Sequence, residues 1–287
     1  MPFYLAATYT VTMNKFPKAK KHWGQNFFTS PEYLEDLIEP LDLQPNDHVI
    51  EIGPGHGILT DILLAQVAQV KAFEIDPELF ALLSEQYASE SKLQLVHQDF
   101  MHSQPDNWFP AVNLNQRKLI ANIPYHLTSL ILMKVLNEKV LKKGLDSQTA
   151  LFSDICLMVQ AEVADKLSAS PGDSAWNALS LTVQFAAEVD VMGYLPRELY
   201  EPMPNVDSAL IRLRPYLESP VKLANPDIFW QLVARSFQMR RKNLRNVLKS
   251  MDVSAETLEH IESGFDLRRR GETLSIPEMA ALAARIT

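Results

Sequence analysis

Residues 48–64 read HVIEIGPGHGILTDILL and establish the class of fold. His48–Ile52 is short and mostly apolar, which predicts a buried strand. Glycine then occupies every second position from 53 to 57, which lets the backbone turn sharply and approach a ligand closely. Ile58–Leu64 follows with apolar side chains at helical spacing. A strand, a glycine-rich turn and a helix in this order open a nucleotide-binding α/β unit.

Strands and helices keep alternating on both sides of this unit. Further strands are predicted at 70–75, 93–96, 118–121, 155–159 and 209–213, and helices at 31–38, 77–88 and 161–167. The first of these helices has Ser30 as its cap and Pro31 in its first turn. The alternation predicts an α/β fold with a mostly parallel, doubly wound, Rossmann-like sheet.

The chain beyond the last predicted strand has a different pattern. Three prolines between positions 215 and 226 mark a linker. Helical spacing then recurs at 228–237, 242–248, 255–263 and 277–286. We therefore predict an α/β domain over residues 22–214 and a small all-helical domain over 215–287. Residues 1–21 are expected to be a disordered basic extension, with Met13 as the natural start.

The formal net charge of −8 conceals two basic segments. Residues 1–30 contain no acid and four lysines, namely Lys15, Lys18, Lys20 and Lys21. Residues 226–250 contain Asp227 as their one acid, together with Arg235, Arg240, Arg241, Lys242, Arg245 and Lys249. Basic segments on an acidic protein indicate local binding of phosphate groups, although two solvated faces would have the same composition.

Composition also restricts the compartment and the chemistry. The single cysteine, Cys156, excludes an internal disulfide and fits a reducing compartment such as the cytoplasm. No apolar run reaches the roughly 18–20 residues that a membrane span needs. The seven histidines show no metal-ligand spacing, so we predict neither a membrane span nor a metal site.

Acidic residues around the glycine turn favour S-adenosylmethionine over a dinucleotide as the cofactor. Glu51 lies two residues before the first glycine, whereas a dinucleotide turn spaces its glycines to hold a pyrophosphate. Glu74 and Asp76 end the second strand about 20 residues after the turn, where an acid can accept the hydroxyls of a ribose. Asp99 follows the third strand and is placed to contact an adenine amino group. A dehydrogenase is the more distant alternative.

The stretch Asn122-Ile123-Pro124-Tyr125 follows the fourth strand, at the edge where open α/β sheets bind ligands. The exocyclic amine of adenine is a poor nucleophile because its lone pair is shared with the ring. The Asn122 side-chain oxygen and the Ile123 carbonyl could accept the N–H protons of this amine, and Tyr125 could stack on the base. An ordinary turn stiffened by Pro124 is the alternative interpretation.

Taken together, the motifs of this chain resemble those of the small-subunit ribosomal RNA adenine dimethyltransferases of the KsgA type, from about Lys18 to the C-terminus. The matching stretches are Gly24–Phe27, Glu51–Gly57, Glu74–Asp76, Gln98–Asp99, Asn122–Tyr125, Met158–Val163, Pro204–Ala209 and Phe237–Asn246. The resemblance makes 22–214 a catalytic domain that binds S-adenosylmethionine, and 215–287 a helical domain that binds RNA or the ribosome.

The resemblance also implies the reaction and the residues that carry it. The expected reaction is N6,N6-dimethylation of two adjacent adenosines near the 3′ end of 16S rRNA, in the small (30S) ribosomal subunit, by a monomer. The cofactor would lie against Asn26, Phe28, Gly53, Gly55, Glu74, Asp76, Asp99 and Asn122. The adenine would be held by Asn122, Ile123, Pro124, Tyr125 and Tyr200. The RNA would contact Lys18, Lys20, Lys21, Arg240, Arg241, Lys242 and Arg245.

The chain departs from the family pattern at several positions. Tyr200 replaces an expected phenylalanine, so its additional hydroxyl needs a hydrogen-bond partner or water. Asn205 and Ala161 replace lysines and remove positive charge from the α/β domain. Thr128–Leu130 lacks an expected proline, and Phe28 replaces a common leucine.

Two other functions compete with this one. The related enzymes that methylate an adenine of 23S rRNA and confer antibiotic resistance have nearly the same Asn122–Tyr125 motif. The basic stretch Arg240–Asn246 favours the small-subunit type over them. A ribosome-assembly factor without catalysis is the other alternative, and the intact cofactor acids argue against it.

Overall fold

The computed structural model describes residues 17–109, 111–137 and 150–286. Most of the expected disordered extension, with Lys15 in it, therefore lies outside the described residues. Residues 17–21 are described, and Lys21–Trp23 form a short 3₁₀ turn, η2.

A seven-stranded sheet forms the centre of the described chain. Its strands are β2 (His48–Ile52), β3 (Gln69–Glu74), β4 (Leu93–His97), β5 (Arg117–Asn122), β6 (Asp154–Gln160), β7 (Ala187–Leu195) and β9 (Ser208–Pro215). Their order is β4-β3-β2-β5-β6-β9-β7. The first five in this order run parallel, as predicted, whereas β9 lies antiparallel to both β6 and β7.

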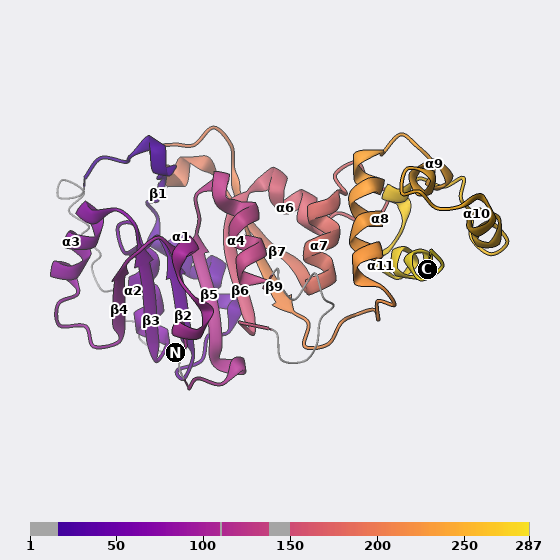
Figure 1. Ribbon diagram of the computed structural model, residues 1–287. Helices are drawn as coiled ribbons and strands as arrows, with labels where there is room; N and C mark the ends of the chain where they lie inside the picture. Colours follow the sequence, from indigo (N-terminus) through magenta and orange to yellow (C-terminus); the bar gives the residue numbers. More distant parts are fainter. Residues whose placement is uncertain (1–16, 110, 138–149, 287) are drawn as a thin grey trace.

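Helices accompany the sheet and then continue alone. Those of the α/β part are α1 (Pro31–Ile38), α2 (Ile58–Gln66), α3 (Pro77–Gln86), α4 (Thr128–Val135), α6 (Ala161–Ser168) and α7 (Ala178–Ala186). The C-terminal ones are α8 (Pro226–Gln238), α9 (Leu244–Lys249), α10 (Ala255–Glu262) and α11 (Ile276–Ala283). In Figure 1 these last four lie together beyond β7 and α7, at the end of the molecule away from β4.

The central strands β2 and β6 are buried along nearly their whole length, as is the apolar middle of β5, which explains their nearly continuous apolar sequences, whereas the edge strands β4 and β7 are partly exposed. Leu119 and Ala121 of β5 point into one core with α4 and α7, whereas Ile120 points into another with α1 and α2. Because side chains alternate along a strand, one run of apolar residues serves both cores. Both cores together fix β5, and with it the position of Asn122 at its carboxyl end.

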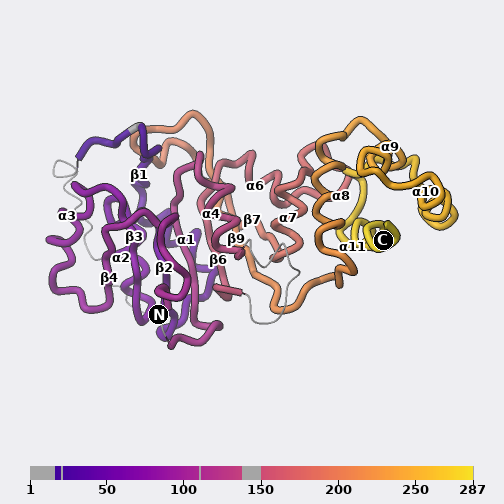
Figure 2. Tube along the Cα trace, in the orientation of Figure 1, coloured from indigo at the N-terminus to yellow at the C-terminus, as the bar shows by residue number. Residues whose placement is uncertain are grey.

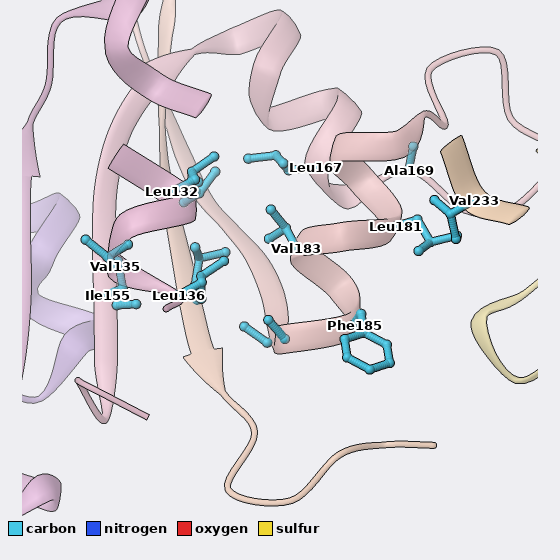
Figure 3. Close-up of a cluster of buried hydrophobic side chains, with 14 of the residues drawn as sticks. Leu132, Val135, Leu136, Ile155, Leu167, Ala169, Leu181, Val183, Phe185 and Val233 are labelled. Atoms are coloured by element: carbon cyan, nitrogen blue, oxygen red, sulfur yellow. The ribbon is translucent and has the colours of Figure 1, made fainter. Parts of the chain in front are cut away.

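The C-terminal helices share the first of these cores. Phe229 of α8 is fully buried, and its ring centre lies 5.5 Å from that of Phe185 in α7. Leu181 of α7 and Val233 of α8 belong to the same buried cluster, and Figure 3 shows them facing each other. Apolar packing therefore continues without interruption from the sheet into the helical part.

Two very short strands close the end of the sheet near the glycine turn. β1 (Phe27–Phe28) pairs antiparallel with β8 (Tyr200–Glu201), so that Phe28 lies opposite Tyr200. In Figure 2 the indigo segment that contains β1 meets the orange segment that precedes β9. This pairing brings residues that are far apart in the sequence beside the carboxyl ends of the central strands.

Candidate active site

A pocket opens at the carboxyl ends of β2, β3 and β5. Nine of the predicted site residues line it, namely Asn26, Phe28, Gly53, Gly55, Glu74, Asn122, Ile123, Pro124 and Tyr125. Trp23, Gln25, Glu51, His56, Ile75 and Met158 also contribute to its wall. Three predicted residues, Asp76, Asp99 and Tyr200, are not among the described residues that line it.

The glycine turn requires glycine at the positions that the sequence indicated. Gly53, Gly55 and Gly57 have φ angles of 67°, 59° and 85°, in the left-handed region that other residues rarely adopt. A Cβ added at Gly55 would lie 3.0 Å from the Phe27 ring. One added at Gly57 would lie 2.5 Å from the Tyr87 hydroxyl. A side chain at position 55 would therefore disturb Phe27 in the pocket wall, and one at position 57 would displace Tyr87.

Glu74 provides a buried carboxylate at the end of β3. It is 3% exposed, and its Oε1 accepts a hydrogen bond of 2.8 Å from the Asp76 backbone N–H. Burial raises the pKa of Glu74, and backbone N–H groups from Asp76 and Gly55 oppose that rise. A carboxylate held in this way can accept hydrogen bonds from ligand hydroxyls.

Asp76 caps helix α3 and lies behind the pocket wall. Its Oδ1 accepts from the Glu78 backbone N–H at 2.9 Å and from Lys20 Nζ at 2.8 Å. Its Oδ2 accepts from Gln25 Nε2 at 3.0 Å. Burial alone would raise the pKa of Asp76, but these partners lower it below the ordinary value. Both oxygens are thus already engaged by protein groups.

Asp99 begins the short 3₁₀ turn Phe100–His102 after β4. Its Oδ1 accepts a hydrogen bond of 2.8 Å from the Met101 backbone N–H. Its Oδ2 lies 3.6 Å from Nδ1 of His102, and about a third of the side chain is exposed. Its assignment to the cofactor's adenine stays a prediction.

Glu51 and His56 contribute more to the wall than the sequence suggested. Glu51 is 1% exposed and accepts a hydrogen bond of 2.7 Å from Thr60 Oγ1. Burial raises the pKa of Glu51 to about 8. His56 stacks on Phe27 with ring centres 3.8 Å apart, and burial lowers its pKa to about 4, so the ring is neutral near pH 7. The sequence signal that could have indicated this role is their position within the stretch Glu51–Gly57.

Asn122 is oriented by the segment that contains β1. Its Nδ2 donates to the Asn26 carbonyl at 3.3 Å. This bond uses the donor end of the amide, so the acceptor end, Oδ1, stays available. A planar amine brought to the pocket would meet that oxygen.

Tyr125 is held by a residue of β9, which lies two strands away from β5 in the sheet. Its hydroxyl lies 2.7 Å from Oγ of Ser208, the first residue of β9, and Ser208 is fully buried. Burial raises the pKa of Tyr125, so its hydroxyl stays protonated near neutral pH. Ser208 was not singled out from the sequence, although it lies within the matching stretch Pro204–Ala209.

Tyr200 packs beside this pair without entering the pocket wall. Its ring meets Phe28 edge-on at 5.2 Å, and the side chain is 4% exposed. Its hydroxyl approaches the Ser208 hydroxyl, which opposes the rise in the Tyr200 pKa that burial causes, but this contact lacks the geometry of a full hydrogen bond. The additional hydroxyl therefore has only a poorly aligned partner among the described residues, and Tyr125 already bonds that partner.

The predicted RNA-binding residues divide into engaged and exposed groups. Lys20 bonds Asp76 and Glu78, Arg240 is paired with Glu272, and Arg245 is paired with Glu262. Lys18, Arg241 and Lys242 are exposed, and the side chain of Lys21 lies outside the described part. Of the two residues that replace expected lysines, Asn205 is exposed and Ala161 is the first residue of α6.

The described residues contain neither a metal-ligand cluster nor a membrane-spanning helix. No group of three or more histidine, cysteine, aspartate or glutamate side chains among them could hold a metal ion. No helix that they form is long and apolar enough to cross a membrane.

Comparison with known proteins adds relatives over nearly the whole chain. The family described as ribosomal RNA adenine dimethylase matches residues 16–287. A "Ribosomal RNA small subunit methyltransferase A" of Geobacillus thermodenitrificans is 36% identical over 274 residues, which cover 92% of this chain and 89% of that protein. One of Clostridium botulinum strain Kyoto is 34% identical over 274 residues, covering 94% and 95%.

Solved structures share the fold. A dimethyladenosine transferase from Plasmodium falciparum superimposes with a TM-score of 0.73 at 23% identity, covering 89% of this chain and 95% of that one. The 23S rRNA methyltransferase ErmE gives a TM-score of 0.64 at 24% identity, covering 91% and 99%.

Proposed function

Since the chain belongs to the ribosomal RNA adenine dimethylase family, we propose that it methylates adenine N6 atoms of small-subunit ribosomal RNA. The full reaction is the transfer of two methyl groups from S-adenosylmethionine to each of two adjacent adenosines near the 3′ end of 16S rRNA. The observation that carries this proposal is Asn122, whose amide is oriented by Asn26 at the mouth of a pocket that also contains Glu74.

The pocket suits S-adenosylmethionine. A Cβ added at Gly53 would meet no heavy atom within 4 Å, so the turn leaves open space beside it. Glu74 offers a buried acceptor for ribose hydroxyls, and Phe28 and Ile75 offer apolar surface. When bound, the cofactor supplies a methyl group that its sulfonium already activates, so no covalent nucleophile is needed from the protein.

The residues of β5 and its following loop act on the acceptor amine. Oδ1 of Asn122 and the carbonyl of Ile123 accept hydrogen bonds from the two N–H groups of the unmethylated amine, which concentrates the nitrogen lone pair on the face toward the methyl donor. One such hydrogen bond remains available to the amine after the first transfer. Tyr125 stacks on the base, and its bond to Ser208 fixes the plane of the stack. Together these contacts favour in-line transfer.

The test is methyl transfer from labelled S-adenosylmethionine to small ribosomal subunits that lack the modification, with large subunits as the control. Labelled adenosines are then mapped in the RNA. We expect label in two adjacent adenosines near the 3′ end of 16S rRNA. Label in the large subunit would favour the 23S alternative, and binding without transfer would favour a non-catalytic assembly factor.

Asn122→Ala provides the matched test of the mechanism. We expect a loss of at least about 10²-fold in turnover and a much smaller loss of cofactor affinity, because the variant removes an acceptor that activates the amine but leaves Glu74 and the glycine turn in place. Labelled methyl transfer measures the first quantity and calorimetry the second. Turnover close to the wild-type value would contradict the assigned role.

Oligomeric state and cellular location are part of the same proposal. We propose that the enzyme acts as a monomer in the cytoplasm, where small subunits are available as substrate. Sedimentation at working concentrations tests the oligomeric state, and the distribution of the tagged full-length chain tests the location.

A further inference from the structure

Residues 20–29, here called the strap, form one side of the pocket before the fold proper begins. Trp23, Gly24, Gln25 and Asn26 all line the pocket, as do both residues of β1. In Figure 2 this indigo segment crosses from the neighbourhood of α3 to the orange segment that contains β8. Its course links the end of β3 to the end of β5.

The first end of the strap is attached to helix α3 through charge. Nζ of Lys20 lies 2.8 Å from Oδ1 of Asp76 and 2.8 Å from Oε1 of Glu78. The Asp76 side chain is 1% exposed, whereas that of Lys20 is 22% exposed. A carboxylate buried to this degree needs charged or hydrogen-bonded partners to remain ionised, and the strap supplies them.

Gln25 completes this attachment. Its Nε2 donates to Oδ2 of Asp76 at 3.0 Å, and its Oε1 accepts from the Lys20 backbone N–H at 2.7 Å. The two strap residues therefore bond one oxygen of Asp76 each, and they also bond each other. The Lys20 ammonium also lies 5.0 Å from the centre of the Trp23 ring, so the same cation contacts a residue of the pocket wall.

The middle of the strap rests on the loop that follows β5. Gly24 has a φ of 64°, and a Cβ added there would lie 3.1 Å from Nδ1 of His126. Two residues later, the Asn26 carbonyl accepts the bond from Asn122. The strap thus touches Asp76, next to the proposed ribose acceptor, and also Asn122, the proposed amine acceptor.

The second end is held by the backbone rather than by charge. Phe28 pairs with Tyr200, and the Thr29 N–H donates to the Leu199 carbonyl at 2.8 Å. This end is anchored by a sheet contact, so the attachment that ionic strength or a single substitution can release is the one at Lys20 and Gln25.

We propose that Lys20, Gln25 and Asp76 form a latch that holds the strap closed over the cofactor and so sets the affinity for it. Lys20 is then a positioning residue of the cofactor site rather than a contact to RNA phosphates. The inference rests on the proposed function, because the ligand under the strap is taken to be S-adenosylmethionine.

The test uses the full chain without RNA, with S-adenosylmethionine as the titrant in calorimetry. We expect Lys20→Met to weaken binding about tenfold, since it leaves the buried Asp76 with fewer partners. Lys20→Arg, which keeps the charge, should stay within about threefold of the wild type. Lys222→Met, at an exposed lysine outside both the strap and the predicted RNA-binding residues, is the matched control, and it should leave cofactor affinity unchanged.

Two further readouts separate the latch from a general loss of structure. In methyl transfer to small subunits, Lys20→Met should raise KM for the cofactor about tenfold and change kcat by less than about twofold. Gln25→Ala, which keeps the ion pair, should weaken binding in the same direction by a smaller factor. Melting temperatures of the ligand-free variants report on the fold itself.

The outcomes distinguish this proposal from the proposed function. Failure of the wild-type chain to bind S-adenosylmethionine would overturn the proposed function. Normal binding by the wild type together with unchanged binding by Lys20→Met and Gln25→Ala would overturn the latch alone. A Lys20→Met variant that binds the cofactor normally but loses RNA affinity with a flatter salt dependence would return Lys20 to the role of a phosphate contact.

Discussion

At the scale of single residues, the buried acid in front of the glycine turn determines a dependence of stability on pH. Folding raises the pKa of Glu51 to about 8 from an ordinary value near 4.5. Between these two values the folded chain keeps the proton and the unfolded chain loses it. The free energy of unfolding therefore falls as pH rises through this window, by up to about 1.4 kcal/mol per pH unit.

Glu51→Gln should remove this contribution, since the amide does not titrate and can still accept from Thr60. We expect the variant to gain stability over the wild type progressively from about pH 4.5 to about pH 8, and to differ little in trend outside that window. Urea unfolding at several pH values measures the difference. Glu85→Gln, at an exposed position of α3, is the control. Parallel pH curves for the wild type and Glu51→Gln would contradict the assignment.

Two neighbouring tyrosines should respond oppositely to loss of their hydroxyls. The Tyr200 hydroxyl is buried and contacts Ser208 only in poor geometry, so Tyr200→Phe should raise the free energy of unfolding by about 1 kcal/mol. The Tyr125 hydroxyl bonds Ser208 at 2.7 Å, so Tyr125→Phe should lower it by about 1 kcal/mol. Chemical unfolding at pH 7 measures both, and a loss of stability in Tyr200→Phe would show that its hydroxyl is satisfied.

At the scale of elements, the basic residues from the end of α8 into α9 differ in whether an acid is paired with them. Arg240 and Arg245 are paired with acids from later turns of the chain, whereas Arg241 and Lys242 are exposed. Free cations release more counterions from a phosphate backbone than cations that already have a partner. We therefore expect Arg241 and Lys242 to contact RNA phosphates, and Arg240 and Arg245 to stabilise the fold.

Replacing Arg241 and Lys242 with glutamine should weaken RNA binding and reduce the slope of log K against log salt by about 1.5, because up to two phosphates lose a contact. The matched double variant at Arg240 and Arg245 should change the slope less and the melting temperature more. Filter binding to small-subunit RNA over a salt series provides the slopes. Equal slopes for the two variants would show that the internal pairs open on binding.

The sequence predicted the buried central strands well and the edge of the sheet poorly. Strands β2, β5 and β6 were predicted to within one residue at each end. A strand that is buried on both faces has a continuous apolar sequence, which makes its ends easy to recognise. The mostly parallel order followed from alternation with helices. Strand β7 was missed, although its residues 187–191 alternate between small or apolar and acidic side chains. Its antiparallel partner β9 was predicted only as a final strand.

The candidate site divides in a similar way. Glycine positions and the Asn122–Tyr125 stretch are determined by local backbone requirements, so they were readable from spacing. The partners of Lys20, Arg240 and Arg245 come from 17 to 58 residues away in sequence. Charge alone cannot distinguish a cation that is free for RNA from one that is paired inside the protein. Ser208 was likewise inconspicuous until β9 brought it to Tyr125.

At the scale of the whole molecule, the predicted boundary between residues 214 and 215 separates parts that share a core. Phe229 of α8 packs on Phe185 of α7, and both are fully buried. Two units with a common apolar core should unfold together rather than in sequence. The division of the chain into two domains at residue 215 stays a prediction. Whether the two parts unfold together is a separate question, which the shared core bears on.

We therefore expect one unfolding transition in calorimetry for the whole chain. Phe229→Ala should lower the free energy of unfolding by about 3–5 kcal/mol, since it leaves a large cavity between α7 and α8. The wild type and the variant should each show a single transition, at different temperatures. Two resolved transitions, with only the weaker one shifted by the substitution, would show that the helical part unfolds independently.

The strand order has a consequence for biosynthesis. β9 is synthesised last among the strands of the large sheet, yet it lies between β6 and β7 and carries the Ser208 that fixes Tyr125. A growing chain that has emerged only as far as Asn122 already contains the glycine turn and Glu74, but not this partner. The bond that fixes Tyr125, the proposed platform for the base, thus forms only after residue 215 has left the translating ribosome, so this part of the proposed substrate site is completed late in the synthesis of the chain.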